Sequence, residues 1–301
     1  MALPSEKILV LINPISGGNS DKGNLAELAR ATLDAERYDV DIVITEHRGH
    51  ATELATQAVA DGARCVVAVG GDGTVNEIGA VLRGTDTALA VVPTGSGNGL
   101  ARHIHIPMNA AAALQVVNDM QIEEVDFCTV NDRPFFCTCG VGFDAQVSHK
   151  FANEDTRGLI TYVKTTINEF FHYKSQDYRI TIGDQSWQER AFVIACCNAA
   201  QYGNNAIVAP RASMRDGKID MTIIHSFKLP EAALLSARLF TSTIDRDRNV
   251  SIYRASRIAI DRDAPGIMHL EGEPVEMPEH LDICCHSLGL RVVVPNPGRD
   301  I

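Results

Sequence analysis

Short apolar runs alternate with helical patterns through the first 125 residues of the chain. The runs at 7–12, 65–69 and 88–92 contain almost no polar side chains and are rich in aliphatic residues, which is typical of strands buried on both faces. Between the runs, apolar residues recur at helical spacing, as at Leu25, Leu28 and Leu33. We expect strands at 7–12, 38–45, 65–69, 88–92 and 121–127, and helices at 21–36, 51–60, 74–82 and 109–118, with a short helix from residue 99. This alternation predicts a parallel α/β nucleotide-binding domain over residues 1–125.

Beyond residue 125 the pattern changes to a series of short strands. We expect strands at 133–139, 178–182, 190–197, 219–225, 257–260, 266–270, 281–286 and 290–294, and helices at 158–171 and 229–240. Because most of these strands follow one another without a crossover helix, they predict an antiparallel sandwich or barrel-like domain over residues 126–287.

Three of the expected strands in the first domain end in polar loops that contain glycine. The loop sequences are NPISGG at 13–18, GGDG at 70–73 and PTGSGN at 93–98. Glycine lets the backbone approach a ligand closely, and a helix N-terminus offers free N–H groups to an anion. A single GGDG is equally consistent with a plain tight turn, but three such loops at strand ends predict a nucleotide-phosphate site.

Asp72 lies in the middle of this pattern. A carboxylate beside phosphates is costly unless a metal ion bridges the charges, so its presence favours Mg²⁺. The alternative is that Asp72 caps the helix that follows it.

Four motifs together resemble those of the diacylglycerol kinase catalytic-domain superfamily, which includes bacterial lipid kinases and sphingosine kinases. NPISGG, GGDGTVNE and PTGSGNGLARH are similar to its three N-terminal motifs, and Glu271-Gly272-Glu273 is similar to its C-terminal Asp-Gly-Glu. The motifs occur in the family's order, and the resemblance covers nearly the whole chain. It implies ATP and Mg²⁺ as cofactors, a lipid hydroxyl as the acceptor, a β-sandwich second domain, and a final segment at about 288–301 that returns to the first domain.

The loop pattern and the resemblance together assign roles to individual residues. Asp72 would organise metal and phosphate. The residues expected to hold the triphosphate or border the nucleotide are Asn13, Thr45, Gly70, Gly71, Gly73, Thr74, Asn76 and Ser96.

The resemblance places the catalytic base at Glu271, where the family has aspartate. The extra methylene displaces the carboxylate by roughly 1.5 Å, and a misplacement of about 1 Å can cost about a hundredfold in rate. Glu273, expected on the same strand face, would support the metal or the hydroxyl. The alternative for Glu271 is a solvent-facing residue at a strand end.

A second metal site is implied by the loop 213–218. It resembles a family loop that holds a structural Mg²⁺ outside the nucleotide site, with the Asp216 carboxylate and the carbonyls of Ser213 and Lys218 as ligands. A plain Asp-Gly turn remains the alternative.

The composition and charge of the chain argue against some binding partners and some cellular locations. The formal net charge of −11 argues against nonspecific nucleic-acid binding. No apolar run reaches the ~18 residues of a membrane-spanning helix, so we expect a cytoplasmic protein that visits the membrane surface to meet its lipid. The eight cysteines form no zinc or disulfide pattern and are expected to be reduced. The sequence does not decide between a monomer and a homodimer.

Two other functions stay open. GGDGT is shared with NAD kinases, so a soluble NAD-kinase-like enzyme is one alternative. Glu271 in place of aspartate motivates the other, a nucleotide-binding regulatory protein with weakened catalysis.

Overall fold

The computed structural model describes residues 5–16, 22–152 and 173–296, and it divides the chain into two compact units. Unit 1 comprises Met1–Asp126 and Leu288–Ile301, and unit 2 comprises Phe127–Ser287. Two strands, β5 (Ile122–Val130) and β15 (His280–Val293), contribute residues to both units. The helix expected at 158–171 lies outside the described residues.

Unit 1 is built on a parallel sheet, as predicted. Its central strands are β1 (Glu6–Ile12), β2 (Tyr38–Ile44), β3 (Cys65–Gly70) and β4 (Ala88–Pro93), in the order β4-β3-β1-β2. The end of β15 adds to the β4 edge in parallel, with Val292 opposite Leu89. Every residue of β3 and β4 is buried, which requires cover on both faces of the sheet.

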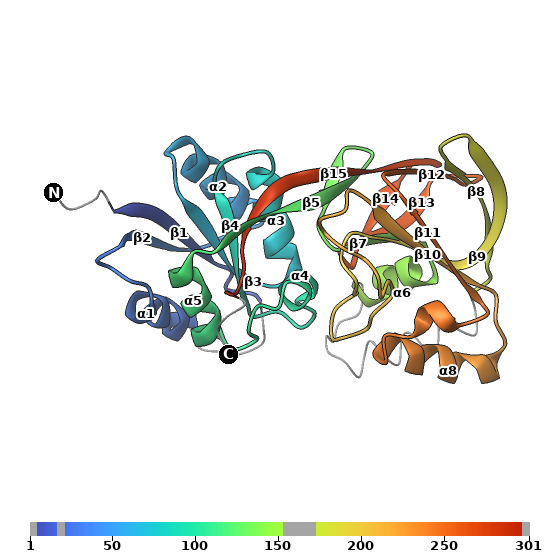
Figure 1. Cartoon of the computed structure of the whole chain (residues 1–301), viewed down its shortest axis with the longest axis horizontal. Coiled ribbons are helices and arrows are strands. Elements are labelled where there is room, and N and C mark those ends of the chain that lie inside the picture. The colour runs from blue at the N-terminus through green and yellow to red at the C-terminus, as the bar shows by residue number, and fades with distance from the viewer. Residues whose placement is uncertain (1–4, 17–21, 153–172, 297–301) are drawn as a thin grey trace. The chain divides into compact units, whose positions relative to one another are not determined.

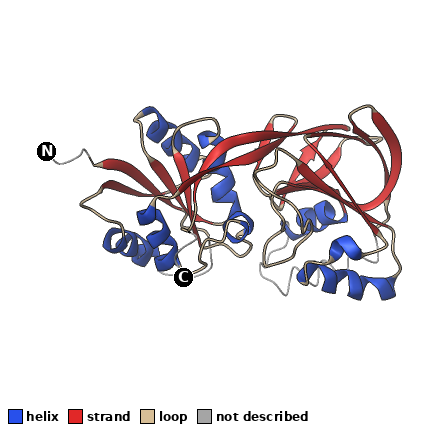
Figure 2. Cartoon of the chain, in the orientation of Figure 1, coloured by secondary structure: helices blue, strands red, loops and turns tan. Residues whose placement is uncertain are grey.

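Helices provide that cover (Figures 1 and 2). They are α1 (Lys22–Thr32), α2 (His50–Ala60), α3 (Asp72–Leu82), α4 (Gly99–His103) and α5 (Ala110–Asp119). Helix α1 packs with α5, and α2 packs with α3. The Asn109 side chain accepts a hydrogen bond from the Ala112 amide, which fixes the start of α5.

Unit 2 is antiparallel, again as predicted. Its other strands are β6 (Arg133–Phe135), β7 (Thr138–Gly142), β8 (Gln176–Ile182), β9 (Gln185–Cys197), β10 (Ile219–His225), β11 (Val250–Ala255), β12 (Arg257–Asp261), β13 (Gly266–Leu270) and β14 (Glu273–Met277). Among the described residues its helices are α6 (Phe143–Ala152), α8 (Leu229–Phe240) and the short η1 (Ile244–Arg246).

The long strand β9 organises unit 2, because it pairs with β7, β8 and β10. The second half of β9 is buried on both faces. Ile194 and Cys196 enter one apolar core, whereas Val193, Ala195 and Cys197 enter a second one. Alternate residues of β9 therefore belong to two different apolar cores, one on each face of the strand.

Several details differ from the sequence-based expectation, and two strands, β11 and β14, were not among those predicted. The strand expected at 133–139 is two strands, β6 and β7, and the strands expected at 281–286 and 290–294 are one continuous β15. Helix α6 was not expected, because its few apolar residues make no clear helical stripe. Among the described residues, no helix is long and apolar enough to cross a membrane.

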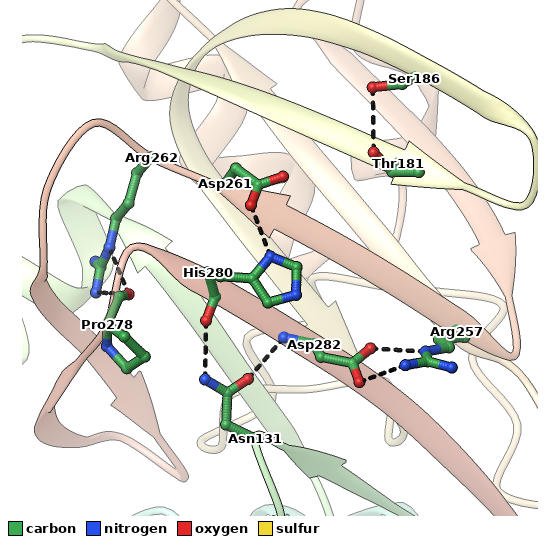
Figure 3. A network of polar contacts seen from close by, with 9 residues as sticks. All are labelled: Asn131, Thr181, Ser186, Arg257, Asp261, Arg262, Pro278, His280 and Asp282. Carbon is green, nitrogen blue, oxygen red and sulfur yellow. Dashed lines mark hydrogen bonds and ion pairs between the residues drawn. The ribbon is translucent and has the colours of Figure 1, made fainter.

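A turn residue, Asn131, ties the β5–β6 hairpin to β15 (Figure 3). Its Nδ2 donates to the His280 carbonyl (2.8 Å), and its Oδ1 accepts from the Asp282 amide (2.7 Å). Its backbone has φ 44°, a left-handed conformation that asparagine tolerates better than most residues. The Asp282 carboxylate in turn receives two hydrogen bonds from Arg257, which lowers the pKa of Asp282.

Replacing Asn131 should separate the contribution of its hydrogen bonds from that of its backbone conformation. Asn131→Gly loses two hydrogen bonds and should lower the free energy of unfolding by about 2 kcal/mol. Asn131→Ala also places a Cβ in the left-handed region and should cost about 1 kcal/mol more. Urea denaturation of both variants measures the difference; equal losses would contradict the role given to the backbone.

Candidate active site

The loops that follow β1, β3 and β4 meet at the carboxyl edge of the unit 1 sheet. The Asn13 amide donates to the Val69 carbonyl (3.0 Å), and the Asn13 side chain donates to the Thr74 hydroxyl (2.8 Å). The hydroxyls of Ser16 and Thr94 are hydrogen-bonded at 3.1 Å. The structure therefore brings together the three loops that the sequence singled out.

Two of these loops touch backbone to backbone. A Cβ built on Gly95 would lie 2.5 Å from the Cα of Gly71, and one built on Gly71 would lie 3.2 Å from the Cα of Gly95. The Thr94 amide donates to the Gly70 carbonyl at 2.9 Å. Glycine is needed at 95 because a neighbouring main chain, unlike a flexible side chain, has little room to move.

Asp72 holds the loop at 93–98 to the loop at 70–73. Its Oδ2 accepts from the Asn98 amide (2.8 Å) and its Oδ1 from the Gly99 amide (2.6 Å), so the carboxylate caps α4 rather than its own helix. Burial raises the pKa of Asp72, although the amides of Gly99 and Asn98 act in the opposite direction. From the sequence, Asp72 was expected to organise metal and phosphate or to cap the helix that follows it. The contact with α4 was not expected, because it joins residues 26 positions apart in the sequence.

Asn98 was not selected by sequence reasoning, yet it shapes the second loop. Its side chain accepts from the Gly95 amide (3.0 Å) and donates to the Gly95 carbonyl (2.7 Å), and its backbone has φ 52°. An asparagine between two glycines was the available signal, because asparagine favours both left-handed backbone and local side-chain hydrogen bonds.

The N-terminus of α3 opens onto these loops. The first bond within the helix runs from the Val75 amide to the Gly71 carbonyl, so the amides of Asp72, Gly73 and Thr74 have no acceptor within the helix. Gly73 is exposed. Such an N-terminus favours an anion through its N–H groups and its dipole.

The remaining predicted nucleotide residues surround this edge. Thr45 is buried directly after β2, with its hydroxyl donating to the Ile12 carbonyl (3.4 Å). Asn76 lies in the second turn of α3, and Ser96 is exposed in the second glycine loop. Their part in binding a nucleotide stays a prediction.

Glu271 lies in unit 2, in the two-residue turn between β13 and β14. Glu271 (φ 54°) and Gly272 (φ 79°) are both left-handed, as in a type I′ hairpin. The Glu271 carboxylate accepts from the backbone amides of Phe136, Cys137 (2.8 Å) and Thr138 (3.4 Å). It is therefore held against the chain before β7, and is not a strand-end side chain that faces only solvent.

The expected relation between Glu271 and Glu273 was wrong. Glu273 is the exposed first residue of β14 and pairs with Leu270, whereas Glu271 is in the turn, so the two do not share a strand face. The physical reason is the left-handed turn, which reverses the chain between them. Whether either carboxylate acts in catalysis stays a prediction.

The loop at 213–218 also has a geometry that the sequence did not indicate. The Asp216 carboxylate accepts from the Lys218 amide (3.1 Å) and forms an ion pair with Arg254. Arg254 lies directly opposite Asp220 across β10 and β11, and its Nε is 3.2 Å from that carboxylate. Ser213 accepts from the Arg215 amide at 3.3 Å.

In this structure the Asp216 carboxylate is paired with a guanidinium, and a Mg²⁺ held by this carboxylate and the carbonyls of Ser213 and Lys218 stays a prediction. No described group of three or more His, Cys, Asp and Glu side chains is arranged to hold a metal. Six of the eight cysteines are buried, and the other two are half-buried.

Gly95→Ala should destabilise unit 1 through the contact with Gly71. We expect a loss of about 2–3 kcal/mol in the free energy of unfolding, the cost of overpacking against main chain. Gly62→Ala is the matched control: its φ is +71° with open space around it, so it should cost only about 1 kcal/mol. Denaturant unfolding compares the two, and a Gly95→Ala variant as stable as the control would contradict the close approach.

His103, the last residue of α4, should make stability depend on pH. Burial lowers the pKa of His103 from 6.5 to about 4, so the unfolded chain takes up a proton first as the pH falls. Stability should therefore decrease between about pH 6.5 and pH 4, by the order of 1–2 kcal/mol because the half-buried ring is partly screened. His103→Gln should flatten this part of the profile, whereas His105→Asn should reduce its slope by a smaller amount, because the charge of His105 lowers the pKa of His103 less than burial does.

Both units of the chain match known protein families. Residues 7–130 match the family model described as "Diacylglycerol kinase catalytic domain", and residues 137–292 match "YegS C-terminal NAD kinase beta sandwich-like domain". A "Diacylglycerol kinase" of Mycobacterium tuberculosis is 28% identical over 97% of this chain and 96% of its own length. A "Probable lipid kinase YegS-like" of Xanthomonas oryzae pv. oryzae is also 28% identical, over 94% of this chain and 95% of its own length.

Solved structures share the fold at lower identity. A crystal structure described as a diacylglycerol kinase from Bacillus anthracis has a TM-score of 0.73 at 18% identity and covers 98% of both chains. Yeast NADH kinase complexed with NADH has a TM-score of 0.57 at 11% identity, over 98% of this chain and 85% of its own. With both family models matched in order, the chain belongs to the diacylglycerol kinase catalytic-domain family with a YegS-type C-terminal domain.

Proposed function

We propose that this protein is an ATP-dependent lipid kinase that transfers the γ-phosphate to a hydroxyl of a lipid such as diacylglycerol. The observation that carries the proposal is the junction of three loops around the N-terminus of α3, in a chain of the diacylglycerol kinase family. A reaction of this kind needs little covalent chemistry from the protein. It needs a held triphosphate, an oriented acceptor and a group that takes the hydroxyl proton.

The triphosphate is assigned to unit 1. The amides of Gly70, Gly71, Gly73 and Thr74 would hold the phosphates, because glycine exposes the main chain and the first N–H groups of α3 have no main-chain acceptor within the helix. The nucleotide would be bordered by the side chains of Asn13, Thr45, Asn76 and Ser96.

Mg²⁺ would enter with ATP, since it is usually held by substrate phosphates, water and one or two carboxylates. Asp72 fits that requirement: its carboxylate accepts the amides of Asn98, Gly99 and Asp72 itself, and a carboxylate has about four acceptor positions. The ion would neutralise the phosphate charge, while Asp72 keeps the two glycine loops together.

The acceptor is assigned to unit 2. Glu271 would take the hydroxyl proton, with Glu273 as a supporting carboxylate. The backbone amides that donate to the Glu271 carboxylate fix its direction. We expect the enzyme to work from the cytoplasm, reaching its lipid at the membrane surface.

One observation favours a second candidate, a nucleotide-binding protein with little or no turnover. The Glu271 carboxylate already serves backbone amides, and a base whose acceptor positions are partly occupied is a weaker one. This candidate predicts ATP binding with no labelled lipid.

Transfer of label from γ-labelled ATP to lipids in mixed micelles with Mg²⁺ tests the proposal. Glu271→Gln should lower kcat by about 10²–10⁴ with the KM for ATP nearly unchanged, since it removes the proton acceptor. Asp72→Ala should instead raise the KM for ATP, because α4 and its loop lose their anchor. Glu276→Gln, an exposed carboxylate on β14, is the matched control and should leave both constants unchanged.

The outcomes separate the candidates. Label in lipid that is lost in Glu271→Gln supports the kinase and its base. Label in added NAD, with none in lipid, would refute the lipid kinase in favour of an NAD-kinase-like enzyme. ATP binding without labelled product would leave the second candidate.

A further inference from the structure

A carboxylate on α3 caps the start of α2 and has no role in the function proposed above. The Glu77 Oε1 accepts hydrogen bonds from the Thr52 amide (3.1 Å) and from the Thr52 hydroxyl (3.2 Å). Thr52 is the third residue of α2, and Glu77 lies in the second turn of α3. One carboxylate oxygen therefore joins two packed helices through residues 25 positions apart in the sequence.

The start of α2 has no cap of its own. Its N-cap residue is Gly49, which has φ 88° and makes no side-chain hydrogen bond to the helix. An N-cap side chain ordinarily accepts from the amide of the second or third helical residue. Glu77 accepts from the third, and it can reach that amide because side chains on a helix point toward the helix N-terminus. Glu77 therefore supplies, from outside α2, the acceptor that Gly49 lacks.

The two helices begin at the same edge of the unit 1 sheet. Strands β2 and β3 both pair in parallel with β1, so their carboxyl ends lie at one edge. Thr45 follows β2 and precedes α2, whereas the glycine loop 70–73 leads into α3. The contact of Glu77 with Thr52 therefore joins the Thr45 side of the candidate nucleotide site to its phosphate side.

Thr45, β1 and α2 are connected to one another by other contacts. The Thr45 amide donates to the Ile12 carbonyl at the end of β1 (2.9 Å). The next residue, Glu46, donates its amide to the Nδ1 of His50, the first residue of α2 (3.0 Å). Glu77 therefore connects α3 to an assembly whose other members are held together without it.

The N-terminus of α3 is also held by contacts that do not involve Glu77. The Asn13 side chain donates to the Thr74 hydroxyl, and Asp72 accepts from the Asn98 amide. Loss of Glu77 should therefore leave the glycine loops formed, while it loosens the position of α3 relative to α2.

We propose that Glu77 is a positioning residue for the nucleotide: by capping α2 from α3 it sets the separation between the phosphate loops and Thr45. The inference rests on the proposed ATP-dependent function and adds a residue to its nucleotide site. ATP has to reach both parts of that site, with its phosphates at α3 and its nucleoside beside Thr45. Inorganic tripolyphosphate carries the same chain of phosphates without the nucleoside, so it needs only the α3 part.

Three substitutions separate the reach of the Glu77 side chain from its charge. Glu77→Asp keeps the charge but withdraws the carboxylate by about 1.5 Å, a carbon–carbon bond length. Glu77→Gln removes the charge but keeps the reach and an oxygen that accepts from Thr52. Glu77→Ala removes both.

Calorimetric titration of these variants with ATP and with tripolyphosphate, both in Mg²⁺, tests the proposal. Glu77→Asp and Glu77→Ala should raise the Kd for ATP by about 3- to 10-fold, the usual effect of a lost hydrogen bond. Their Kd for tripolyphosphate should stay within about twofold of the wild-type value, and Glu77→Gln should bind both ligands as the wild type does. Glu53→Gln is the matched control, because it removes an exposed carboxylate from the same first turn of α2 and should change neither Kd.

Other roles for Glu77 give different results, each of which would overturn the inference. Simple repulsion between its carboxylate and the phosphates would make both ligands bind more tightly to Glu77→Gln and Glu77→Ala. A purely structural cap would lower the melting temperature of Glu77→Asp and Glu77→Ala and leave both Kd values as in the control. Equal weakening of both ligands would show that the phosphate loops themselves depend on Glu77.

The design also separates this inference from the proposed function. If Glu77→Ala does not fold, Glu77→Asp decides, and a Kd for ATP equal to that of the control overturns the proposal. A wild-type chain that binds no ATP would instead be a failure of the proposed function itself.

Discussion

The contact between the two glycine loops of unit 1 is the constraint on which the candidate site depends. Gly71 and Gly95 meet main chain to main chain, and the Asp72 carboxylate joins them by accepting the amides of Asn98 and Gly99. Because the loops follow adjacent parallel strands, β3 and β4, the sheet already places them side by side. The short side chains then let the backbone amides converge, which is what a phosphate needs and what a surface of larger side chains would prevent.

In unit 2 the partners of each carboxylate differ in charge. Two of its carboxylates are held by neutral donors: Glu271 by backbone amides, and Asp144 by a phenol, an imidazole and an amide. Asp216, in contrast, is balanced by the guanidinium of Arg254. A carboxylate with neutral partners keeps its charge available to a ligand, whereas an ion-paired one does not. This distinction separates candidate binding groups from groups that stabilise the fold.

Much of the architecture could be predicted because it depends on local pattern. The apolar runs at β1, β3 and β4 and the glycines that follow them indicated buried parallel strands with open loops, and the structure has them. Helix α6 could not be predicted in the same way, since its sequence, FDAQVSHKFA, lacks a clear apolar stripe. The turn at Glu271 and Gly272 was also missed, because glutamate is seldom left-handed and adopts that conformation here with its carboxylate bound to distant amides.

The sequence by itself determined the two fold classes, the loop residues and the family resemblance. These depend on strand and helix periodicity, on the positions of glycines and on the order of motifs, which are all properties of the sequence alone. Only the tertiary structure decided what each charged group touches. Asp72 meets α4, Asp216 meets Arg254, and His269 meets Asp144 across 26, 38 and 125 positions of sequence respectively. Hydrogen bonds and ion pairs act over a few ångströms in space, so partners this far apart in sequence become visible only when the sheets bring their strands together.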